Sequence, residues 1–461
     1  MNPTHDAIVI GSGQAGPFLA VQLAQAGRRV ALIEREHVGG TCVNDGCIPT
    51  KALVASARAA HVARRAADWG VRIGGDVSVD FAAVMARKDA VVAQSVQGLT
   101  KWLEGTDGVE LIRGHARFTA PHAVEVNGQA LAAGQIFINT GGRAVLPPWP
   151  GIETVPVLTN TSMMSLAELP RHLLVVGGSY IGLEFAQMFR RFGAEVTVLE
   201  YADRLIARED PEVSREVQAI LEREGLRVLT GVRDARVAPA AGGVRVICSA
   251  GGALHELTGS HLLAAVGRRP NTDDLGLEKA GIATDTRGFI TVDDQLRTSV
   301  PGIWALGDVN GRGAFTHTSY HDHEIVVANL LRGEQRRVSE RIGCYALFTD
   351  PPLGRVGMTE SEVRASGRPA LAATLPMTRV GRARERGETQ GFMKVLVDAQ
   401  TERFLGAAFL GIEGDEVVHT IIDAMAAGTP YRTIQRAVHI HPTVSELIPT
   451  LLGQLAPLAP A

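Results

Sequence analysis

The sequence is short of cysteine, of long apolar runs and of net charge, and each shortage excludes a class of protein. Four cysteines in 461 residues are too few for a secreted fold held together by disulfides. No run of about 20 apolar residues is present, so we expect no membrane span. The formal net charge of −3 gives no electrostatic reason to expect nucleic acid or a membrane surface as a partner.

What remains is the composition of a large globular protein. A chain of 461 residues exceeds one compact core, so we expect several domains. Apolar residues make up 45% and charged residues 21%, which is typical of a soluble protein. No basic segment precedes the first apolar run, so we expect a strand there rather than a signal peptide, and a cytoplasmic location.

Two of the four cysteines, Cys42 and Cys47, lie five positions apart in the run GGTCVNDGCIPTK at residues 39–51. If the chain is helical from about Cys42, the two side chains are a little over one turn apart, close enough for a disulfide. A thiol at a helix N-terminus also has its thiolate stabilised by the helix dipole. The spacing alone leaves open a reversible dithiol–disulfide couple and a pair of ordinary buried cysteines.

A strand–turn–helix–strand unit with a glycine-rich turn opens the chain. Residues 6–10 and 29–34 are the predicted strands, and residues 17–26 are the predicted helix. Glycines let the backbone approach a pyrophosphate at the helix N-terminus, and an acid at the end of the second strand would accept hydrogen bonds from a ribose diol. The glycines and the acid are Gly11, Gly13, Gly16 and Glu34.

A second unit of the same kind lies further along the chain. A strand at 173–176 leads into a turn that runs from Gly177 to Gly182, a helix at 181–192 follows, and a strand at 195–200 ends in Glu200. Ser179 stands where the middle glycine of the pattern is expected. Two such units predict two dinucleotides, and this favours hydride transfer through a flavin.

Together these motifs resemble the class I pyridine nucleotide-disulfide oxidoreductases, the family of dihydrolipoamide dehydrogenase, glutathione reductase and mercuric reductase. The resemblance extends over nearly the whole chain. It implies an α/β FAD/NAD(P)-linked reductase fold with two Rossmann-like dinucleotide-binding domains and an α+β C-terminal dimerisation domain. The expected ranges are 1–147 and 269–338 for the FAD-binding domain, 148–268 for the NAD(P)H-binding domain and 339–461 for the dimerisation domain.

The resemblance also assigns residues to the two cofactors, FAD and NADH. The turn after the strand near 136–138 resembles the family's exit from the FAD domain, with Asn139 in place of the usual alanine. Asp308, after the strand near 303, matches the aspartate that binds the ribityl chain. The residues implied to contact a cofactor are Gly11, Gly13, Gly16, Glu34, Thr41, Lys51, Thr140, Gly141, Gly177, Gly182, Glu200, Gly267 and Asp308.

Glu200 bears on which nicotinamide nucleotide is used. A carboxylate at this position accepts hydrogen bonds from a free 2′-hydroxyl and repels a 2′-phosphate, so it favours NADH over NADPH. Arg204 and Arg208 lie close by in sequence, and they keep NADPH open as the alternative.

The catalytic roles follow from the same resemblance. Cys47 would be the thiolate beside the flavin, and Cys42 would be the thiol that meets the acceptor. Lys51 would lie near the flavin N5 with Glu184 as its partner. His441 and Glu446 match the family's acid–base pair, in which an imidazole takes the thiol proton and a carboxylate orients the ring. In the family this pair comes from the other subunit, so a homodimer is implied. The implied catalytic residues are Cys42, Cys47, Lys51, Glu184, His441 and Glu446.

The electron acceptor stays open at this stage. His441 and Glu446 favour a small disulfide such as lipoamide. Thr50 and the stretch 315–324 resemble the mercuric reductases, so a reductase of Hg²⁺ or Cu²⁺ is the alternative, although no second cysteine pair follows Glu446 to deliver a soft metal. A non-enzymatic FAD-binding redox sensor is the hypothesis from a different class.

The last two features concern a histidine cluster and the C-terminal tail. Among His317, His321 and His323, the last two are two positions apart in a predicted helix and do not share a face, so we expect packing rather than a metal site. The apolar tail at 451–461 is expected to fray or to pack at the dimer interface.

Overall fold

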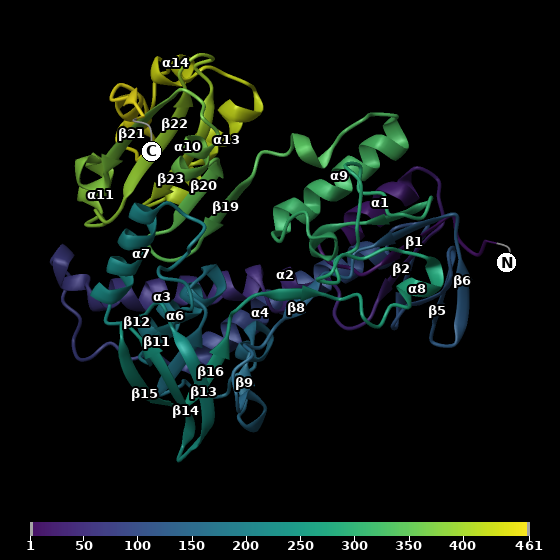
Figure 1. Ribbon diagram of the computed structural model, residues 1–461, viewed down its shortest axis with the longest axis horizontal. Helices are drawn as coiled ribbons and strands as arrows, with labels where there is room; N and C mark the ends of the chain where they lie inside the picture. Colours follow the sequence, from purple (N-terminus) through teal and green to yellow (C-terminus); the bar gives the residue numbers. More distant parts are fainter. Residues whose placement is uncertain (1–2, 459–461) are drawn as a thin grey trace.

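Three large β-sheets organise the computed structural model, which describes residues 3–458 (Figure 1). Two of the sheets are parallel and five-stranded, and the third is antiparallel and six-stranded. The antiparallel sheet lies in the C-terminal part of the chain, at the upper left of Figure 1. Two parallel sheets of the Rossmann-like type, together with a separate C-terminal unit, confirm the predicted fold class.

The first parallel sheet has the strand order β18-β7-β1-β2-β3. Its central strands are short and wholly buried, as expected for a parallel sheet with both faces covered. β18 comes from a segment far along the chain, so two separate segments build this sheet. The strands are β1 (Ala7–Ile10), β2 (Val30–Glu34), β3 (Val109–Arg113), β7 (Gln135–Ile138) and β18 (Ile303–Ala305).

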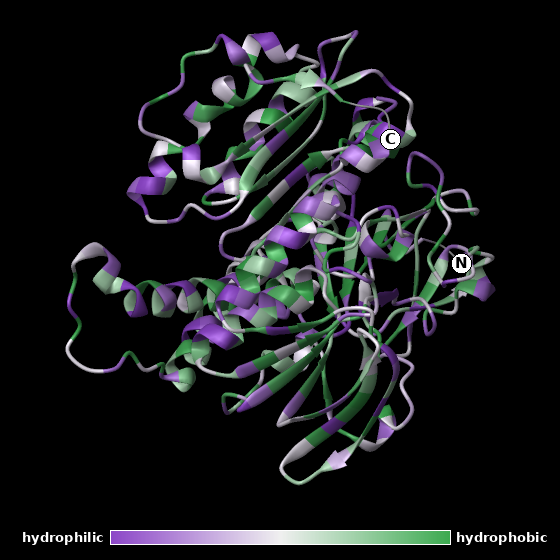
Figure 2. Ribbon diagram, turned by 60° about the vertical axis from the view of Figure 1, so that its left-hand side comes forward, coloured by the Kyte–Doolittle hydropathy of each residue, from purple (hydrophilic) through white to green (hydrophobic). Residues whose placement is uncertain are grey.

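The two faces of this sheet are covered by different layers. Ala7 and Val9 of β1 pack with the helices on one face, while Ile8 and Ile10 pack with a small antiparallel sheet on the other. Green, hydrophobic segments therefore run along the strands in Figure 2. The covering elements are the helices α1 (Gly16–Gln25) and α9 (Thr316–Arg332) and the strands β4 (Arg117–Ala120), β5 (Ala123–Val126) and β6 (Gln129–Ala132).

The second parallel sheet, of order β12-β11-β10-β16-β9, repeats the strand–turn–helix–strand unit of the first. A three-stranded antiparallel sheet covers it, again by alternating side chains. The elements are β9 (Val157–Leu158), α5 (Asn160–Met163), β10 (His172–Val176), α6 (Tyr180–Phe192), β11 (Glu195–Leu199), α7 (Pro211–Arg223), β12 (Arg227–Leu229), β13 (Arg233–Ala240), β14 (Gly243–Ala250), β15 (Ala253–Gly259) and β16 (His261–Ala264).

The chain crosses between the two parallel sheets at one place. β8 (Gly142–Ala144), on the way out, pairs antiparallel with β17 (Arg268–Pro270), on the way back. α8 (Leu277–Ala280) follows the return crossing. This agrees with an inserted second domain, while the domain boundaries themselves stay predictions.

The segment that contains the two cysteines forms two helices, where the sequence suggested one continuous helix. α2 (Gly40–Asn44) ends before α3 (Cys47–Arg64) begins, so the helix is interrupted at Asp45 and Gly46. Gly46 is in a non-helical conformation, and a Cβ on it would lie 2.7 Å from the carbonyl oxygen of Thr41. The break puts Cys47 at the first position of α3, where the helix dipole stabilises a thiolate. The next long helix along the chain is α4 (Phe81–Glu104).

The C-terminal unit is an antiparallel sheet of order β19-β20-β23-β22-β21-β24 with short helices around it. Its core is separate from those of the nucleotide-binding sheets. The elements are β19 (Cys344–Leu347), β20 (Leu353–Gly357), α10 (Glu360–Ala365), β21 (Ala370–Pro376), α11 (Gly381–Glu385), β22 (Phe392–Asp398), β23 (Phe404–Leu410), α12 (Gly414–Val417), α13 (His419–Ala426), α14 (Tyr431–Gln435), α15 (Ile448–Leu452) and β24 (Ala456–Pro457).

The C-terminal tail is ordered as far as it is described, so the expectation of fraying is wrong for this part. α15 buries Leu451 and Leu452, and β24 adds an edge strand to β21. Residues 459–461 of the predicted tail lie outside the described residues. Within residues 3–458, no helix is both long and apolar enough to cross a membrane. The short 3₁₀ helices are η1 (Ala66–Trp69), η2 (Ile152–Thr154), η3 (Gly307–Asn310), η4 (Val338–Glu340), η5 (Met377–Arg379) and η6 (Ser445–Leu447).

Candidate redox site

A cavity of about 960 Å³ lies where the two parallel sheets and the C-terminal unit meet. Cys42, Cys47 and Glu184 line it together with many of the residues predicted to contact a cofactor. The predicted cofactor residues in its wall are Gly11, Gly13, Glu34, Thr41, Lys51, Thr140, Gly141 and Asp308. The other predicted site residues are described but are not in this wall, and they are Gly16, Gly177, Gly182, Glu200, Gly267, His441 and Glu446.

Both glycine-rich turns are built in the same way. A Cβ on Gly16 would lie 2.1 Å from the carbonyl oxygen of Gly11, and a Cβ on Gly182 would lie 2.0 Å from that of Gly177. No residue with a side chain fits at either position, because the start of the helix crosses the end of the strand at van der Waals distance. With no side chain at these glycines, the backbone N–H groups at each helix N-terminus are open to a phosphate group.

The acids at the ends of the second strands are held rigidly. The Glu34 carboxylate accepts hydrogen bonds from the backbone N–H of Ser12 at 2.9 Å and from that of Glu36 at 2.8 Å. The Glu200 carboxylate accepts from the backbone N–H groups of Gly178 and Ala202. Both carboxylates lie beside a glycine-rich turn, the place expected for an acid that bonds a ribose.

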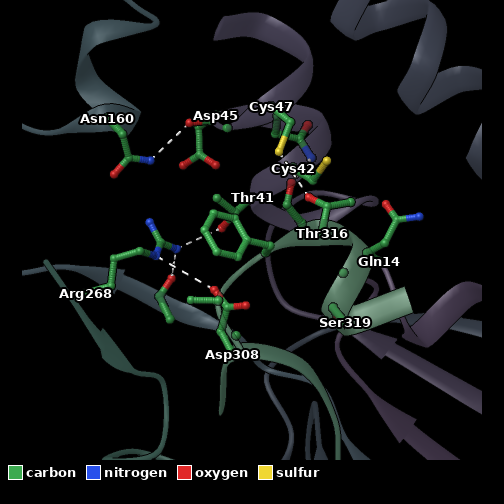
Figure 3. Close-up of a pocket in the computed structure, with 18 of the residues that line it drawn as sticks. Gln14, Thr41, Cys42, Asp45, Cys47, Asn160, Arg268, Asp308, Thr316 and Ser319 are labelled. Carbon is green, nitrogen blue, oxygen red and sulfur yellow. Dashed lines mark hydrogen bonds and ion pairs between the residues drawn. The ribbon is translucent and has the colours of Figure 1, made fainter. Parts of the chain in front are cut away.

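The two cysteines lie side by side in the cavity wall as free thiols (Figure 3). The Cys42 thiol hydrogen-bonds to Cys47 and lowers the pKa of Cys47 to about 6, and Thr316 and Lys51 act in the same direction against the effect of burial. The Oγ1 of Thr316 lies 3.1 Å from the Cys47 Sγ. The same bond, with burial, raises the pKa of Cys42 above its usual range. The pair thus consists of one stabilised thiolate and one protonated thiol.

Lys51 and Glu184 form the pair that the resemblance implies. The Lys51 Nζ lies 2.7 Å from the Glu184 Oε2. Glu184 is buried, and its Oε1 accepts from the backbone N–H of Phe348 at 3.0 Å. The Lys51 ammonium also lies over the Phe348 ring, 4.4 Å from its centroid. The pair joins α3, α6 and the C-terminal unit beside the cysteines.

Asp308 faces the cavity from η3, next to an arginine that the sequence analysis did not single out. Burial raises the pKa of Asp308, and the Arg268 guanidinium 4.0 Å away opposes this. Arg268 also donates to the Thr41 Oγ1 at 3.3 Å, so it bridges two predicted cofactor residues (Figure 3). The sequence indicates Arg268 only through its position directly after Gly267, which was predicted to contact a cofactor.

His441 and Glu446 are together but are apart from the cysteines. The His441 Nδ1 lies 2.8 Å from the Glu446 Oε2, and the His441 side chain is 80% exposed. Its neighbours Val438 and Ile440 are 100% and 80% exposed, which is unusual for large apolar side chains. The pair therefore lies on a surface that also exposes two large apolar side chains.

The three histidines near 320 have separate surroundings. The His317 Nε2 meets the Cys344 carbonyl at 2.8 Å, while His323 is fully buried and packs edge-on against Tyr320. His321 faces the guanidinium groups of two arginines. No group of three or more His, Cys, Asp or Glu side chains in the described part of the chain is arranged to hold a metal ion.

Long-range contacts around the cysteines were missed by sequence reasoning. Asn160 donates to the Asp45 carbonyl at 3.1 Å and Thr161 to the Asp45 carboxylate, so α5 holds the turn between the two cysteines. The contact joins positions more than 100 residues apart, as does that of Thr316 with Cys47. No local pattern carries such a signal.

The residues present fit FAD. The Gly11–Gly16 turn is a cradle that a Cβ would fill, and the fixed carboxylate of Glu34 stands beside it. The same cavity is lined by Gly11 and Gly13 of this turn, by Thr41 and Asp308 and by the two cysteines, and its volume is in the range of cofactor sites. An open cavity that joins a phosphate-binding turn to a dithiol is what a flavin dinucleotide requires.

The fold and the site define a flavin-linked disulfide reductase, and comparison with known families agrees. The chain belongs to the pyridine nucleotide-disulphide oxidoreductase family: residues 5–322 match that family, and residues 344–452 match its dimerisation domain. Members of this class are flavoenzymes that use FAD and NAD(P)H, so the predictions of enzyme class and cofactors are confirmed.

Individual relatives cover almost the whole chain. The probable pyridine nucleotide-disulfide oxidoreductase RclA of Escherichia coli strain K12 is 39% identical over 97% of this chain and 99% of its own. A dihydrolipoyl dehydrogenase of Thermus scotoductus is 36% identical over 96% and 95%, and a mercuric reductase of Staphylococcus aureus is 32% identical over 95% and 81%. A solved Cu(II) complex of the HOCl-induced flavoprotein disulfide reductase RclA from E. coli has a TM-score of 0.88 at 38% identity, over 97% and 99%.

Proposed function

We propose that this enzyme is an NADH-dependent reductase in which Cys42 and Cys47 pass electrons to a small disulfide of the lipoamide type. The observation that carries the proposal is that Cys42 and Cys47 lie side by side in the cavity wall, with the Cys47 Sγ 3.1 Å from the Thr316 Oγ1 (Figure 3). FAD, when bound, supplies the hydride chemistry that connects NADH to this pair. Gly11, Glu34 and Asp308 would hold it.

Side chains of the protein carry out the transfer of electrons from the dithiol to the acceptor. Lys51, paired with Glu184, brings a positive charge to the cysteines and favours the Cys47 thiolate. The His441 imidazole, oriented by Glu446, takes the proton of the Cys42 thiol, and Cys42 then attacks the acceptor disulfide and releases one thiolate. Cys47, as a thiolate, then attacks Cys42, which releases the second thiolate and closes the Cys42–Cys47 disulfide. The departing thiolates take two protons: one is the Cys42 proton returned by His441, and the other comes from solvent.

The exposed position of His441 supports a homodimer as part of this proposal. The His441–Glu446 pair is described but is not in the cavity wall, and it lies in the region that matches the dimerisation domain. A second subunit that covers Val438 and Ile440 would bring the imidazole to the partner's cavity. A cytoplasmic location also belongs to the proposal, because a working dithiol and a nicotinamide donor suit a reducing compartment.

A second acceptor, Cu²⁺, is favoured by one specific observation. The related E. coli RclA, which is 38% identical, has been solved as a Cu(II) complex. The Cys42 thiol and the Cys47 thiolate can together reduce two Cu²⁺ ions to two Cu⁺ ions, which closes their disulfide and releases one proton. This reaction has no departing thiolate, so it does not require His441.

An acceptor panel with the purified holoenzyme tests the proposal. NADH oxidation is measured with lipoamide, glutathione disulfide, Cu²⁺, Hg²⁺ and quinones. We expect rapid turnover of a small disulfide that is lost in Cys42→Ser. We also expect His441→Ala to slow it roughly 10²–10⁴-fold, while the neighbouring control His439→Ala does not.

Each possible outcome of the panel has a clear meaning. Turnover of Cu²⁺ alone, unchanged in His441→Ala, would replace the disulfide by the metal as the acceptor. Activity with quinones alone that survives Cys42→Ser would remove the dithiol from the reaction and contradict the proposal. No turnover of any acceptor would instead support the non-enzymatic sensor.

The preference for NADH is a separate prediction. The Glu200 carboxylate is fixed by two backbone N–H groups at the end of its strand, where it would repel a 2′-phosphate. We expect kcat/KM to be at least about tenfold higher for NADH than for NADPH, and Glu200→Gln to reduce this ratio by about tenfold. Glu195→Gln, at the exposed start of the same strand, is the control. A higher kcat/KM for NADPH would contradict the assignment.

A further inference from the structure

Asn139 lies where the first parallel sheet meets two loops of the FAD site. It follows β7 directly, and its backbone N–H donates to the Ile10 carbonyl at 2.8 Å. Its side chain is 6% exposed, although asparagine is usually found at the surface. A buried amide needs partners for its N–H groups, and the identity of those partners shows what this one does.

The partners of the Asn139 amide are carbonyl groups of the glycine-rich turn. Its Nδ2 donates to the Gly13 carbonyl at 3.1 Å and to the Gly11 carbonyl at 3.3 Å. The Gly11 carbonyl is the group that forbids a Cβ on Gly16. One side chain therefore bonds the two carbonyls that give this turn its shape.

The other end of the same amide faces the second cofactor loop. A Cβ on Gly307 would lie 3.1 Å from the Asn139 Oδ1, and Gly307 directly precedes Asp308. A larger residue at 307 would therefore press on the asparagine. The Asn139 side chain fills the space between the phosphate-binding turn and the loop that carries Asp308.

We propose that Asn139 is a positioning residue for FAD, which sets the phosphate-binding turn by donating hydrogen bonds to the carbonyls of Gly11 and Gly13. A turn that aims N–H groups outward at a pyrophosphate must turn carbonyls inward, and buried carbonyls require donors. The Asn139 amide is such a donor. The inference concerns FAD binding alone and does not depend on the acceptor or on NADH.

Two substitutions separate the donor from the volume of the side chain. Asn139→Ala removes the donor and leaves the carbonyls without this partner, so we expect FAD to bind roughly 10- to 100-fold more weakly. Asn139→Asp keeps the shape but presents a carboxylate that repels both carbonyls at neutral pH, so FAD should bind at least as weakly as in Asn139→Ala. The measurement is the dissociation constant for FAD added to the apoprotein.

A pH profile distinguishes positioning from a general loss of structure. The carboxyl introduced by Asn139→Asp is buried against carbonyls, so its pKa should be raised, and its protonated form can donate a hydrogen bond. We expect FAD affinity of this variant to recover by about tenfold as the pH falls from about 8 to about 5.5, relative to wild type. Asn139→Ala should show no such recovery.

The control is an asparagine in the same domain but away from the cofactor. The Asn329 amide donates to the Arg336 carbonyl at 2.9 Å and its Oδ1 accepts from the Arg336 N–H at 2.8 Å, so Asn329→Ala also removes side chain–backbone bonds. It should leave FAD affinity within about twofold of wild type. Wild-type FAD affinity in Asn139→Ala, or a pH profile of Asn139→Asp parallel to that of wild type, would overturn the proposal. If Asn139→Ala does not fold, the pH profile of Asn139→Asp decides alone.

Discussion

The chemistry of this enzyme depends on how single side chains change each other's protonation. Cys42 and Cys47 are the same residue type in one cavity wall, yet the hydrogen bond between them raises the pKa of the first and lowers that of the second. Thr316 and Lys51 reinforce the difference at Cys47. Two chemically identical thiols thus become a thiolate and a protonated thiol, which are the two forms that an exchange reaction uses in turn.

This division of labour gives a prediction about pH. With its pKa near 6, Cys47 should be a thiolate throughout the neutral range. Cys42→Ala removes the thiol that donates to it, so the midpoint for Cys47 deprotonation should move up towards the ordinary range of a thiol, about 8.5. The midpoint can be followed by the ultraviolet absorbance of the thiolate in reduced apoprotein. Cys248→Ala, which removes a buried thiol of the second parallel sheet's covering layer, should leave the midpoint where it is. An unchanged midpoint in Cys42→Ala would show that Cys42 does not stabilise the thiolate.

At the scale of elements, three helix N-termini in this molecule have a distinct use, and one of them is capped from another domain. Cys47 lies at the N-terminus of α3, and the bare N-terminus of α1 faces the proposed phosphate site. α10, in the C-terminal unit, is capped from the second parallel domain: the buried Asp210 carboxylate accepts from the backbone N–H groups of Glu360 at 2.9 Å and Ser361 at 3.0 Å. The Asp210 carboxylate thereby accepts hydrogen bonds from N–H groups at the start of α10 and joins two domains.

Removal of this cap should destabilise the protein in a pH-dependent way. Burial alone would raise the pKa of Asp210, but the N–H groups of Glu360 and Ser361 hold it below its ordinary value. Its stabilisation is therefore present above the unfolded pKa, about 3.9, and is lost as the pH falls through the folded pKa. We expect Asp210→Ala to lower the free energy of unfolding by about 2–4 kcal/mol at neutral pH, with a smaller difference below about pH 4.

Denaturant unfolding at several pH values measures this effect. Asp80→Ala is the control, because Asp80 caps α4 within one domain at an exposed site, where loss of a cap costs about 1 kcal/mol. Equal losses in both variants would mean that the contact between domains adds nothing to an ordinary helix cap.

At the scale of the whole molecule, an ion-pair network ties the three units together. Asp350 of the C-terminal unit accepts from Arg58 of α3 and from Arg191 of α6. Arg191 is buried and also pairs with Glu224, and Arg58 also pairs with Glu388. Partial burial acts to raise the pKa of Asp350, but the two guanidinium groups outweigh it and lower that pKa. The network therefore links α3 and α6, which carry Cys47 and Glu184 of the cavity wall, to the C-terminal unit.

At the same scale, the proposed function has each active site take its cysteines from one subunit and its histidine from the other. We predict that a mixed dimer with Cys42→Ser in one subunit and His441→Ala in the other keeps about half of the wild-type disulfide reductase activity. One of its two sites carries both changes, while the other carries neither. Each homodimeric variant should lose disulfide turnover, by roughly 10²–10⁴-fold for His441→Ala. The mixed dimer can be purified with two affinity tags and assayed with the acceptor found in the panel. An inactive mixed dimer would mean that each site takes both residues from one chain.

Much of the fold follows from local pattern. β1 and β10 are short apolar runs that end in glycine turns, and β2 and β11 are short runs that end at an acid; such runs form buried parallel strands wherever both faces are covered. The break in the helix between the cysteines was not predictable in this way, because it depends on contact of Gly46 with the Thr41 carbonyl. Nor was the pairing of the tail with β21, because a two-residue edge strand has no pattern of its own.

The amino-acid sequence by itself determined which groups are available: two thiols at a fixed spacing, two phosphate-binding turns, and a histidine with an acid five positions on. These are local features, since spacing and turn glycines act over a few residues. Only the tertiary structure decided other neighbours that tune these groups, such as Thr316 beside Cys47 and Asn139 beneath the glycine-rich turn. Hydrogen bonds and charges act over a few ångströms in space, and that distance is set by how remote parts of the chain pack.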